Sequence, residues 1–506
     1  MLTLYDYQAK AVEEIRQKLK SSRVLFQLAT GGGKTVIFSY IAQKITKKNK
    51  RVLIISHRIE LLTQAGGTLE EFGMQPQIIT AKTKRPRDVS VSVAMVGTLK
   101  NRLKKPEWEK WFLKIDMIII DECHRAEFNY LHTPHCFKLG VTATPKRSGK
   151  MPQLSYEYDI IVSGPDVHEL ILKGRLMTDK YFGVPVDLTG VGKDNTGEFQ
   201  NSQLFNAYNK ATLYQGLIDN WRKLTPDTVT ICFCCNIQHC IQTAISLNEA
   251  GIKAKFVTSK PSKPRIPENE NKATWTLYNR KIEEYNKYTE YYAIYSGDRE
   301  TIVNEWKRGE FSVIINAGIF VEGFDHKPTQ TVILNLATTS ENKYLQMIGR
   351  GSRPSPVTDK KFFNILDFGE NASRLGYYRQ EREYSLHHSE SKGDGVPPSK
   401  TCPKCEALVL ASAQICKYCG FEFPKTEQEQ IAELVEHEYI PKYYNEINFK
   451  KMSIKELEEF ARQKQYKKAW IWQQIFVNHG EEGLKDYAKK NGYHHSWVKR
   501  LIDRYK

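Results

Sequence analysis

The sequence contains no run of about 18 consecutive apolar residues, which is the length that a membrane-spanning helix needs. Its first eight residues hold no basic stretch followed by an apolar run, so we expect no secretory signal peptide. No repeat of fixed period is evident, and neither is a nuclease or protease constellation. These absences exclude a membrane protein, a solenoid and the common hydrolases of peptides, and they leave a chain built from ordinary globular domains.

Cysteine is present, but not in the pattern of a secreted disulfide framework. Six of the ten cysteines are scattered, four of them within residues 232–240, where we expect small core thiols. The other four form two Cys-x-x-Cys pairs, Cys402/Cys405 and Cys416/Cys419, which ten residues separate. Two such pairs suit a tetrahedral Zn²⁺ site, whereas a redox dithiol needs only one pair. Because four protein ligands leave no open position, we expect a structural zinc ribbon.

The balance of charge favours a polyanionic partner. The chain has 75 Lys or Arg against 58 Asp or Glu, which gives a formal net charge of +17. Nucleic acid is the first candidate, although a merely soluble basic protein would have the same balance. Apolar residues make up 40% of the 506 residues, which is enough for several folded cores. Length alone suggests about three or four domains.

Short, nearly continuous apolar runs alternate with stretches of helical periodicity. Such runs are typical of strands buried on both faces of a parallel sheet. The first series lies at residues 24–28, 52–55, 91–96, 117–120 and 139–141, and the second at 229–233, 255–257, 313–316, 332–336 and 362–366. We therefore expect an α/β protein with two tandem parallel-sheet lobes.

Changes of composition predict the domain boundaries. Proline-rich and polar residues at 259–287 interrupt the second series, so we expect an insertion there. Residues 388–400 are typical of a linker. The expected parts are a first lobe at 1–181, a connection at 182–212, a second lobe at 213–387, the linker, a zinc ribbon at 401–424 and a basic helical domain at 425–506.

A glycine-rich loop follows the first apolar run. It consists of Thr30, Gly31, Gly32, Gly33, Lys34 and Thr35. Consecutive glycines let backbone N–H groups curl around phosphate oxygens, and the next helix adds the positive end of its dipole. Lysine then reaches the β- and γ-phosphates, and the threonine hydroxyl binds Mg²⁺. The loop therefore predicts an ATP site. A glycine-rich turn with a surface lysine is the simpler alternative.

An acidic pair follows the apolar run at 117–120. Asp121 and Glu122 lie where open α/β sheets bind their ligands, at the carboxyl end of a strand. We expect Asp121 to hold Mg²⁺, Glu122 to position and deprotonate the attacking water, and His124 to take part in catalysis. An acidic strand end that only caps the next segment is the alternative.

Taken together, these motifs resemble the superfamily 2 helicases of the DExH type, here with Asp-Glu-Cys-His. The resemblance covers residues 1–375 and implies two RecA-like lobes. Gln8 resembles the residue that reads adenine. The resemblance places nucleic acid against His57, Arg58, Thr98 and Thr142, the last within a Thr-Ala-Thr-Pro motif that couples hydrolysis to strand movement.

The second lobe supplies further motifs of the same family. Gln346, Arg350 and Arg353 match its last motif, in which the two arginines share one helix face and act as arginine fingers. Gly323 and Asp325 match a motif that meets ATP and the nucleic-acid backbone. Asn236 lies in a segment that resembles the first region of the second lobe that contacts the nucleic-acid strand in this family. The implied catalytic set is Lys34, Asp121, Glu122, His124, Gln346, Arg350 and Arg353.

The last part of the chain combines charge with aromatic residues. Residues 451–506 hold 13 Lys or Arg against 7 Asp or Glu. Phosphate binding and base stacking would use such a surface, but a small helical domain could instead bury its aromatics in its own core. The aromatic residues are Trp470, Trp472, Tyr487, Tyr493, Trp497 and Tyr505.

The details of the motifs are most similar to repair, recombination and restriction motors, including compact phage helicases that remodel forks and migrate branched junctions. The resemblance implies an ATP-dependent DNA helicase that acts on forked or branched DNA, in the cytoplasm of a bacterial or phage-infected cell. A duplex translocase that separates no strands and an RNA helicase stay open as alternatives. The C-terminal region could also dock replication or recombination proteins.

Overall fold

The computed structural model divides the chain into two compact units, residues 1–439 and 440–506, which are considered separately. In the first unit it describes residues 3–129, 131, 133, 135–147, 152–183, 186–194, 196–258, 263–266, 272–387, 399–401, 408–410 and 435–437; in the second, 453–455, 457–458, 468–493, 498–499 and 501–502. In these parts of the chain no helix is long and apolar enough to cross a membrane.

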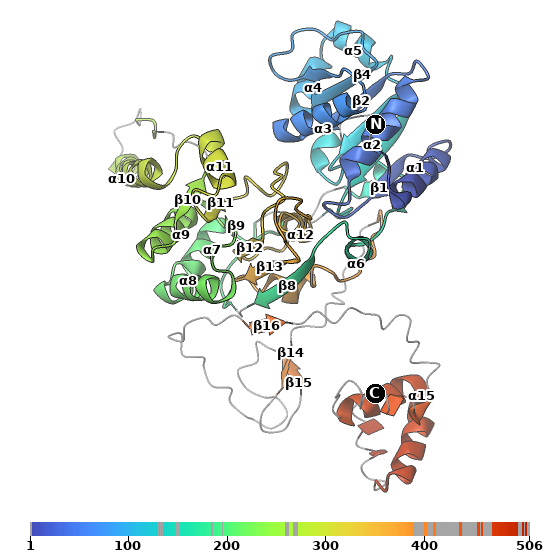
Figure 1. Ribbon diagram of the computed structural model, residues 1–506, viewed down its shortest axis with the longest axis vertical. Helices are drawn as coiled ribbons and strands as arrows, with labels where there is room; N and C mark the ends of the chain where they lie inside the picture. The colour runs from blue at the N-terminus through green and yellow to red at the C-terminus, as the bar shows by residue number, and fades with distance from the viewer. Residues whose placement is uncertain are drawn as a thin grey trace. The chain divides into compact units, whose positions relative to one another are not determined.

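The first lobe is built on a seven-stranded sheet whose pairs are all parallel, in the order β3-β4-β2-β5-β6-β1-β7 (Figure 1). Its elements are α1 (Asp6–Lys18), β1 (Val24–Gln27), α2 (Lys34–Thr46), β2 (Val52–Ser56), α3 (Ile59–Glu71), β3 (Gln77–Ile79), β4 (Val91–Met95), α4 (Val96–Arg102), α5 (Pro106–Phe112), β5 (Met117–Asp121), η1 (Ala126–Phe128), β6 (Phe137–Thr142), η2 (Leu154–Tyr156), β7 (Ile160–Ser163) and α6 (Val167–Leu172).

Alternate residues of each central strand enter different cores, which makes the first lobe a three-layer structure. Along β5, Met117 and Ile119 pack with residues of α1, α2, α3 and α6 on one face of the sheet. Ile118 and Ile120 pack with residues of α4 and α5 on the other face. Because both faces are covered, every strand position must be apolar, which is why the strands appear as continuous apolar runs.

The second lobe repeats this architecture in the order β10-β11-β9-β12-β13-β8-β16, in which only β16 is antiparallel. The two predicted α/β lobes with parallel sheets are thereby confirmed. The elements are β8 (Thr178–Gly183), α7 (Asn201–Tyr208), α8 (Ala211–Leu224), β9 (Thr230–Cys234), α9 (Ile237–Glu249), β10 (Ala254–Val257), α10 (Lys272–Tyr295), α11 (Arg299–Lys307), β11 (Val313–Asn316), β12 (Thr331–Asn335), α12 (Glu341–Ile348), β13 (Phe362–Asp367), α13 (Asn371–Leu375) and β16 (Val435–His437).

The boundary between the sheets differs from the predicted one at residue 181. Strand β8 pairs along its whole length with β13 and therefore belongs to the second sheet. Its sequence, Thr-Asp-Lys-Tyr-Phe-Gly, is too polar to be recognised as a buried strand. Asp179 is nevertheless buried, because Arg379 lies beside it with its Nε 2.8 Å from the carboxylate Oδ1.

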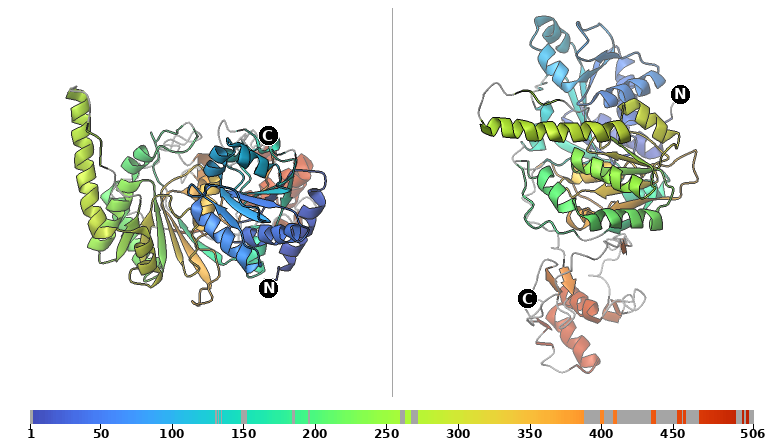
Figure 2. Two further views of the ribbon diagram at one scale, coloured as in Figure 1. Left: turned by 90° about the horizontal axis from the view of Figure 1, so that it is seen from above. Right: turned by 90° about the vertical axis from the view of Figure 1, so that its left-hand side faces the viewer.

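The predicted insertion contains the 24-residue helix α10 (Figure 2). Its C-terminal half packs against α9 and β10, with Tyr288 and Tyr292 each stacked or edge-on against Phe256. Toward its start the side chains are exposed, including Trp275 and Leu277. The helix continues beyond residue 287, the predicted end of the insertion, because tyrosines spaced three and four apart pack as one stripe against the second lobe.

A short antiparallel hairpin, β14 (Ser399–Thr401) and β15 (Leu408–Leu410), brackets the first Cys-x-x-Cys pair in the sequence. The four predicted zinc ligands, Cys402, Cys405, Cys416 and Cys419, lie outside the described residues. Among the described residues no group of His, Cys, Asp and Glu is arranged to hold a metal. The six other cysteines are free, and four of them pack in the core around β9.

In the second unit, helix α15 (Lys468–Lys490) changes direction at Gly480, whose φ is 67°. Leu457, Ile475, Leu484 and Tyr487 are buried in a small core, and Trp472 and Tyr493 pack against it. Of the aromatics singled out above, those that the structure describes thus contribute to a core. The proposal that the tail offers its rings to bases receives no support from these three.

Gly140 offers a test of how tightly the first lobe is packed. A Cβ at this position in β6 would lie 2.4 Å from the ring of the buried Tyr158. We expect Gly140→Ala to lower the free energy of unfolding by about 1 to 3 kcal/mol through overpacking. Urea denaturation followed by circular dichroism measures the change.

The matched control is Gly67→Ala, on the exposed side of α3, where a Cβ would meet no atom within 4 Å. Helix propensity predicts that this change stabilises the lobe by up to about 1 kcal/mol. Equal unfolding midpoints for the two variants would contradict the packing argument.

Candidate active site between the lobes

The glycine-rich loop joins the carboxyl end of β1 to the start of α2. Gly31 and Gly33 have φ angles of 87° and 90°, which other residues rarely adopt, and Gly33 is the N-cap of α2. A Cβ on Gly33 would lie 2.5 Å from the amide nitrogen of Gln8. The hydroxyl of Tyr7 donates to the carbonyl of Gly32 over 2.9 Å. The loop and α1 therefore fit together only because the loop has no side chains.

Lys34 begins α2, and its side chain lies under the loop, where Nζ donates to the carbonyl of Leu28 over 3.3 Å. Burial lowers the pKa of this lysine, and the carboxylates of Glu122 and Asp121 oppose that shift. The cations of Arg350 and Arg353, from the second lobe, lower it further. Charged groups of both lobes thus surround one ammonium group.

Asp121 ends β5 and Glu122 follows it, at the same edge of the sheet as the loop. Both side chains are buried, and burial raises the pKa of each carboxyl, with the charge of Glu122 adding to the effect on Asp121. Glu122 has a φ of 52°, which is uncommon for a residue other than glycine. Such backbone strain persists only where surrounding contacts fix it, and it is typical of functional sites.

A chain of hydrogen bonds runs from Glu122 into the second lobe. The hydroxyl of Thr142 lies 3.4 Å from Glu122 Oε2 and 2.9 Å from His124 Nδ1. On its other side, His124 Nε2 meets the amide Nδ2 of Asn342 in α12. Burial lowers the pKa of His124 to about 3, so the imidazole is neutral.

The bonding roles along this chain follow from the chemistry of the groups. An amide nitrogen only donates, so Nε2 of His124 must accept from Asn342. The proton of the neutral ring is then on Nδ1, which donates to Thr142, whose hydroxyl in turn donates to Glu122. Glu122 is therefore connected to Asn342 of the second lobe by a chain of hydrogen bonds in which the donor and the acceptor of each bond are fixed.

The turn that carries the predicted arginine fingers packs directly on the glycine-rich loop. A Cβ on Gly349 would lie 2.7 Å from Thr30, and a Cβ on Gly31 would lie 3.7 Å from Arg353. The backbone N–H of Met177, just before β8, donates to the carbonyl of Ser352 over 2.6 Å. The two lobes are therefore closely packed at the loop, where Gly31 and Gly349 leave room for the side chains of Arg353 and Thr30.

Both arginines are anchored within their own lobe. Arg350 is buried and donates to the carbonyls of Val321 and Phe324, and Arg353 forms an ion pair with Asp325. Burial lowers the pKa of Arg350, with the neighbouring Arg353 adding to the effect. These contacts hold the guanidinium groups of Arg350 and Arg353 next to the glycine-rich loop without a bound substrate.

Glu322, after β11, is the centre of a second contact between the lobes. Its carboxylate pairs with His57, lies 3.1 Å from Arg58 Nε and lies 3.6 Å from an Nη of Arg125. Burial opposes ionisation of Glu322, but the hydrogen bond from His57 and the nearby cations outweigh it and lower the pKa to about 2. The carboxylate is therefore charged throughout the neutral pH range.

The predicted nucleic-acid residues occupy three different kinds of environment. Thr98 is partly exposed in the first turn of α4, and Asn236 caps α9 by accepting from the N–H of His239 over 2.8 Å. His57 and Arg58 face Glu322. Thr142 is fully buried, with its hydroxyl within the chain of hydrogen bonds between Glu122 and His124.

The structure also adds Asn342 to the site, a residue that the motifs did not indicate. Asn342 lies four positions before the predicted Gln346 and on the same face of α12, a spacing that could have pointed to it. Gln346 is buried, and its carbonyl oxygen has no partner among the described residues. Glu322 stood within a matched motif, but its cationic partners lie more than 190 positions away in the sequence.

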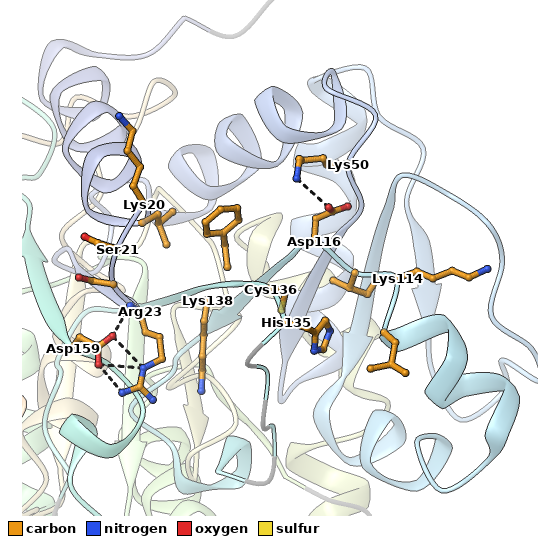
Figure 3. A pocket seen from close by; sticks show the side chains of 15 residues that line it. Lys20, Ser21, Arg23, Lys50, Lys114, Asp116, His135, Cys136, Lys138 and Asp159 are labelled. Atoms are coloured by element: carbon orange, nitrogen blue, oxygen red, sulfur yellow. Dashed lines mark hydrogen bonds and ion pairs between the residues drawn. The ribbon is translucent and has the colours of Figure 1, made fainter.

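A cavity of about 670 Å³ lies at the edge of the first sheet that is opposite to the glycine-rich loop (Figure 3). Its cations are largely paired within the lobe, Arg23 with Asp159 and Lys50 with Asp116. It lies at the amino ends of the strands, away from the glycine-rich loop and the acidic pair. Position and charge both favour the edge at the lobe interface as the active site.

Comparison with known families gives the same two halves. Residues 1–147 match the family described as type III restriction enzyme, res subunit, and residues 266–355 match the helicase conserved C-terminal domain. The chain carries the ATP-hydrolysing core of a superfamily 2 helicase. The predicted enzyme class, an ATP-hydrolysing helicase of superfamily 2, is confirmed.

Individual relatives agree with this core. A 51.5 kDa protein of a Lactococcus phage (isolate 7-9) is 26% identical over 80% of this chain and 79% of its own length. IRC3 of Saccharomyces cerevisiae, an inferred ATP-dependent helicase, is 29% identical over 72% of this chain, which spans 51% of that protein. A fragment of an inferred HsdR subunit of a type I restriction enzyme from Vibrio vulnificus YJ016 has the same fold, with a TM-score of 0.53 at 20% identity over 73% of this chain and 66% of that chain.

The Glu322 contact leads to a test of lobe association. Glu322→Gln keeps the size of the side chain but removes the buried charge that faces His57, Arg58 and Arg125 of the first lobe. We expect the distance between the lobes to become longer and more broadly distributed, because the charged contact across the interface is lost. Energy transfer between one dye on each lobe of the full chain measures this distribution without nucleotide.

The control is Glu310→Gln, which removes an exposed ion pair with Arg308 inside the second lobe, where the two groups lie 2.7 Å apart. It should leave the distribution unchanged, since exposed pairs contribute little. A Glu322→Gln protein with the wild-type distribution would show that the contact does not hold the lobes together.

Proposed function

We propose that the chain is an ATP-driven DNA motor that moves along DNA and unwinds or remodels forked or branched DNA. The observation that carries the proposal is the convergence of two half-sites: a phosphate-binding loop with Asp121 and Glu122 from one lobe, and Arg350 and Arg353 from the other. A site completed by two lobes can convert hydrolysis into relative movement of those lobes.

The residues of the first lobe fit ATP and Mg²⁺. The loop has positive φ angles and no room for side chains, so its N–H groups and those of the first turn of α2 suit phosphate oxygens. Lys34 supplies a cation, and Gln8 lies against Gly33 at the position expected of an adenine reader. Thr35 and Asp121 offer the hard oxygen ligands that Mg²⁺ prefers, and the ion would supply neutralisation of phosphate charge.

Glu122 is the proposed general base. Its raised pKa makes the carboxylate a better proton acceptor than an exposed glutamate would be, and the hydroxyl of Thr142 fixes its orientation. His124 acts through Thr142 as a positioning residue, because its ring is neutral and shares no proton with substrate. Asn342 completes this arrangement only when the second lobe is in place.

Arg350 and Arg353 are the proposed arginine fingers. The close approach of residues 349–353 to the glycine-rich loop supports this role, because the phosphates of ATP would bind at that loop. Gly323, Gln346 and Asp325 belong to the same lobe as the two arginines, and Asp325 forms an ion pair with Arg353. An arginine in this role can accelerate hydrolysis by roughly 10³- to 10⁵-fold, and it makes hydrolysis depend on lobe closure.

The nucleic-acid contacts proposed for His57, Arg58, Thr98 and Asn236 rest on the family motifs. The positive balance of the chain, +17, supports a phosphate backbone as the partner. DNA is favoured because restriction enzymes, which are defined by their action on DNA, are among the matching families and relatives. Duplex translocation without strand separation is kept as the second candidate, because the first lobe matches a restriction-enzyme family.

A structural zinc ribbon at residues 401–424 and a basic domain after it complete the proposal. The hairpin of β14 and β15 supports the ribbon, because Thr401 pairs with Leu408 and residues 402–407, with the first cysteine pair, connect the strands. A Cys-x-x-Cys pair between two strands that are paired with each other suits two thiolates of one tetrahedral site. Branch recognition and docking of replication or recombination proteins are roles that we propose for these parts together with the insertion.

ATP hydrolysis in the presence of different nucleic acids tests the motor. We expect hydrolysis to be stimulated most by forked DNA or a four-way junction, compared with single-stranded DNA, duplex DNA and RNA. Lys34→Ala should lower the stimulated rate by at least about 10²-fold, because a preorganised charge at the phosphates is lost. Steady-state phosphate release measures both effects.

The pattern of stimulation separates the candidates. Stimulation by plain duplex equal to that by branched DNA, with triplex displacement but no unwinding, would identify a translocase. A preference for RNA would overturn the choice of DNA, and no response to any nucleic acid would contradict the motor itself.

The zinc proposal predicts one Zn²⁺ per chain in protein purified without added metal. Cys416→Ser should remove most of it, because a three-thiolate site binds more weakly. Elemental analysis measures the content, and Cys136→Ser, at a partly exposed free cysteine of the first lobe, is the control. Equal zinc in the two variants, or none in the wild type, would reject the ribbon.

A further inference from the structure

After β13 and α13, residues 376–387 return from the second lobe to the first, and we refer to them as the strap. Their exposure alternates: Glu381, Glu383, Ser385 and His387 are exposed, whereas Arg382, Tyr384 and Leu386 are not. This period of two is that of an extended segment with one face on the protein. The strap is thus a second connection between the lobes, in addition to the one before β8.

The two ends of the strap are attached to different lobes. In the second lobe, the guanidinium of Arg382 donates to the carbonyls of Leu375 and Tyr377, over 3.1 and 3.0 Å, and so fixes the turn at the start of the strap. In the first lobe, the carbonyl of Leu386 accepts from the N–H of Ser155 over 3.0 Å, and its side chain packs on the core that contains Tyr158.

The inward side chains of the strap converge on Glu341, the first residue of α12. Arg382 Nε lies 3.0 Å from the carboxylate, and the hydroxyl of Tyr384 donates to it over 3.3 Å. Lys146, which follows the Thr-Ala-Thr-Pro motif of the first lobe, lies 3.2 Å from the other oxygen. Burial raises the pKa of Tyr384, so its hydroxyl keeps its proton and stays a donor.

The next residue on α12 is Asn342, the member of the hydrogen-bond chain that meets His124. The position of the first turn of α12 therefore decides whether the chain to Glu122 is complete. A cavity of about 240 Å³ separates the strap from the glycine-rich loop and is lined by Thr30, Thr144 and Tyr384. The strap contacts α12 directly and faces the glycine-rich loop across this cavity.

We propose that the strap sets the catalytic state of the motor, with Tyr384 and Arg382 as positioning residues that hold Glu341, and through it Asn342, against His124. The proposal rests on the motor function proposed above. Opening or turning of one lobe relative to the other moves the two ends of the strap apart. The strap then withdraws the first turn of α12, and hydrolysis stops until the lobes meet again.

Tyr384→Phe is the sharpest test, because it removes one hydroxyl and leaves the ring in place. We expect the kcat for ATP hydrolysis at saturating DNA to fall about fivefold, the effect of one hydrogen bond, with the KM for ATP unchanged. Leu386→Ala, which loosens the other end of the strap, should change kcat in the same direction. Glu383→Gln, on the exposed face between these residues, is the matched control and should match wild type.

A double-mutant cycle separates positioning from a general loss of structure. If Tyr384 acts through Glu341, then Glu341→Ala and Glu341→Ala/Tyr384→Phe should have the same kcat, since alanine leaves the hydroxyl no acceptor at position 341 and the second change removes nothing further. Wild-type kcat in Tyr384→Phe, additive effects in the cycle, or a raised KM at unchanged kcat would each overturn the proposal.

The assay also distinguishes failure of the strap from failure of the motor. If DNA does not stimulate the wild-type protein, the proposed function fails, and the same variants are compared in their basal hydrolysis above the Lys34→Ala blank. A fivefold fall there keeps the strap as a control of hydrolysis, and no fall rejects it.

Discussion

The interface between the two lobes is held by the burial of acidic groups against cations from the opposite lobe. Glu322 faces three cationic or protonatable side chains of the first lobe, and Glu341 faces Lys146 of the same lobe. Charges in such a place are costly unless they are paired, so any separation of the lobes must be compensated by water or by a ligand. This makes lobe separation a step with two defined end states.

In the mechanism that we propose, hydrolysis depends on this interface through a chain of hydrogen bonds. Glu122 is oriented by Thr142, Thr142 is bonded to His124, and His124 meets Asn342 across the interface. Each link has one donor and one acceptor, so loss of the last contact frees the ring and then the hydroxyl. The strap contacts the preceding residue of α12, Glu341, through an ion pair and a hydrogen bond. In the proposed mechanism, hydrolysis and lobe movement are thereby linked through the first turn of α12.

The insertion and the C-terminal parts are the regions in which this chain has most room for a specific role. Helix α10 extends with exposed Trp275 and Leu277 near its start, while its other half is fixed on the second lobe. The C-terminal unit instead turns its described aromatic rings into a small core. Basic side chains on its surface, and not stacked rings, are therefore the better basis for contacts with a phosphate backbone.

The sequence alone was sufficient for the two α/β lobes, the glycine-rich loop and the acidic pair. These depend on local rules: strands buried on both faces are mostly apolar, and residues other than glycine rarely adopt the backbone angles found at Gly31 and Gly33. Strand β8 escaped prediction because its partner in the sheet is 184 residues away, and its buried aspartate is tolerated only because Arg379 lies beside it. The tertiary structure decided the contacts of Glu322, the place of Thr142 inside the interface and the return of residues 376–387 to the first lobe. None of these is a property of neighbouring residues, because each depends on how two separately folded sheets face one another.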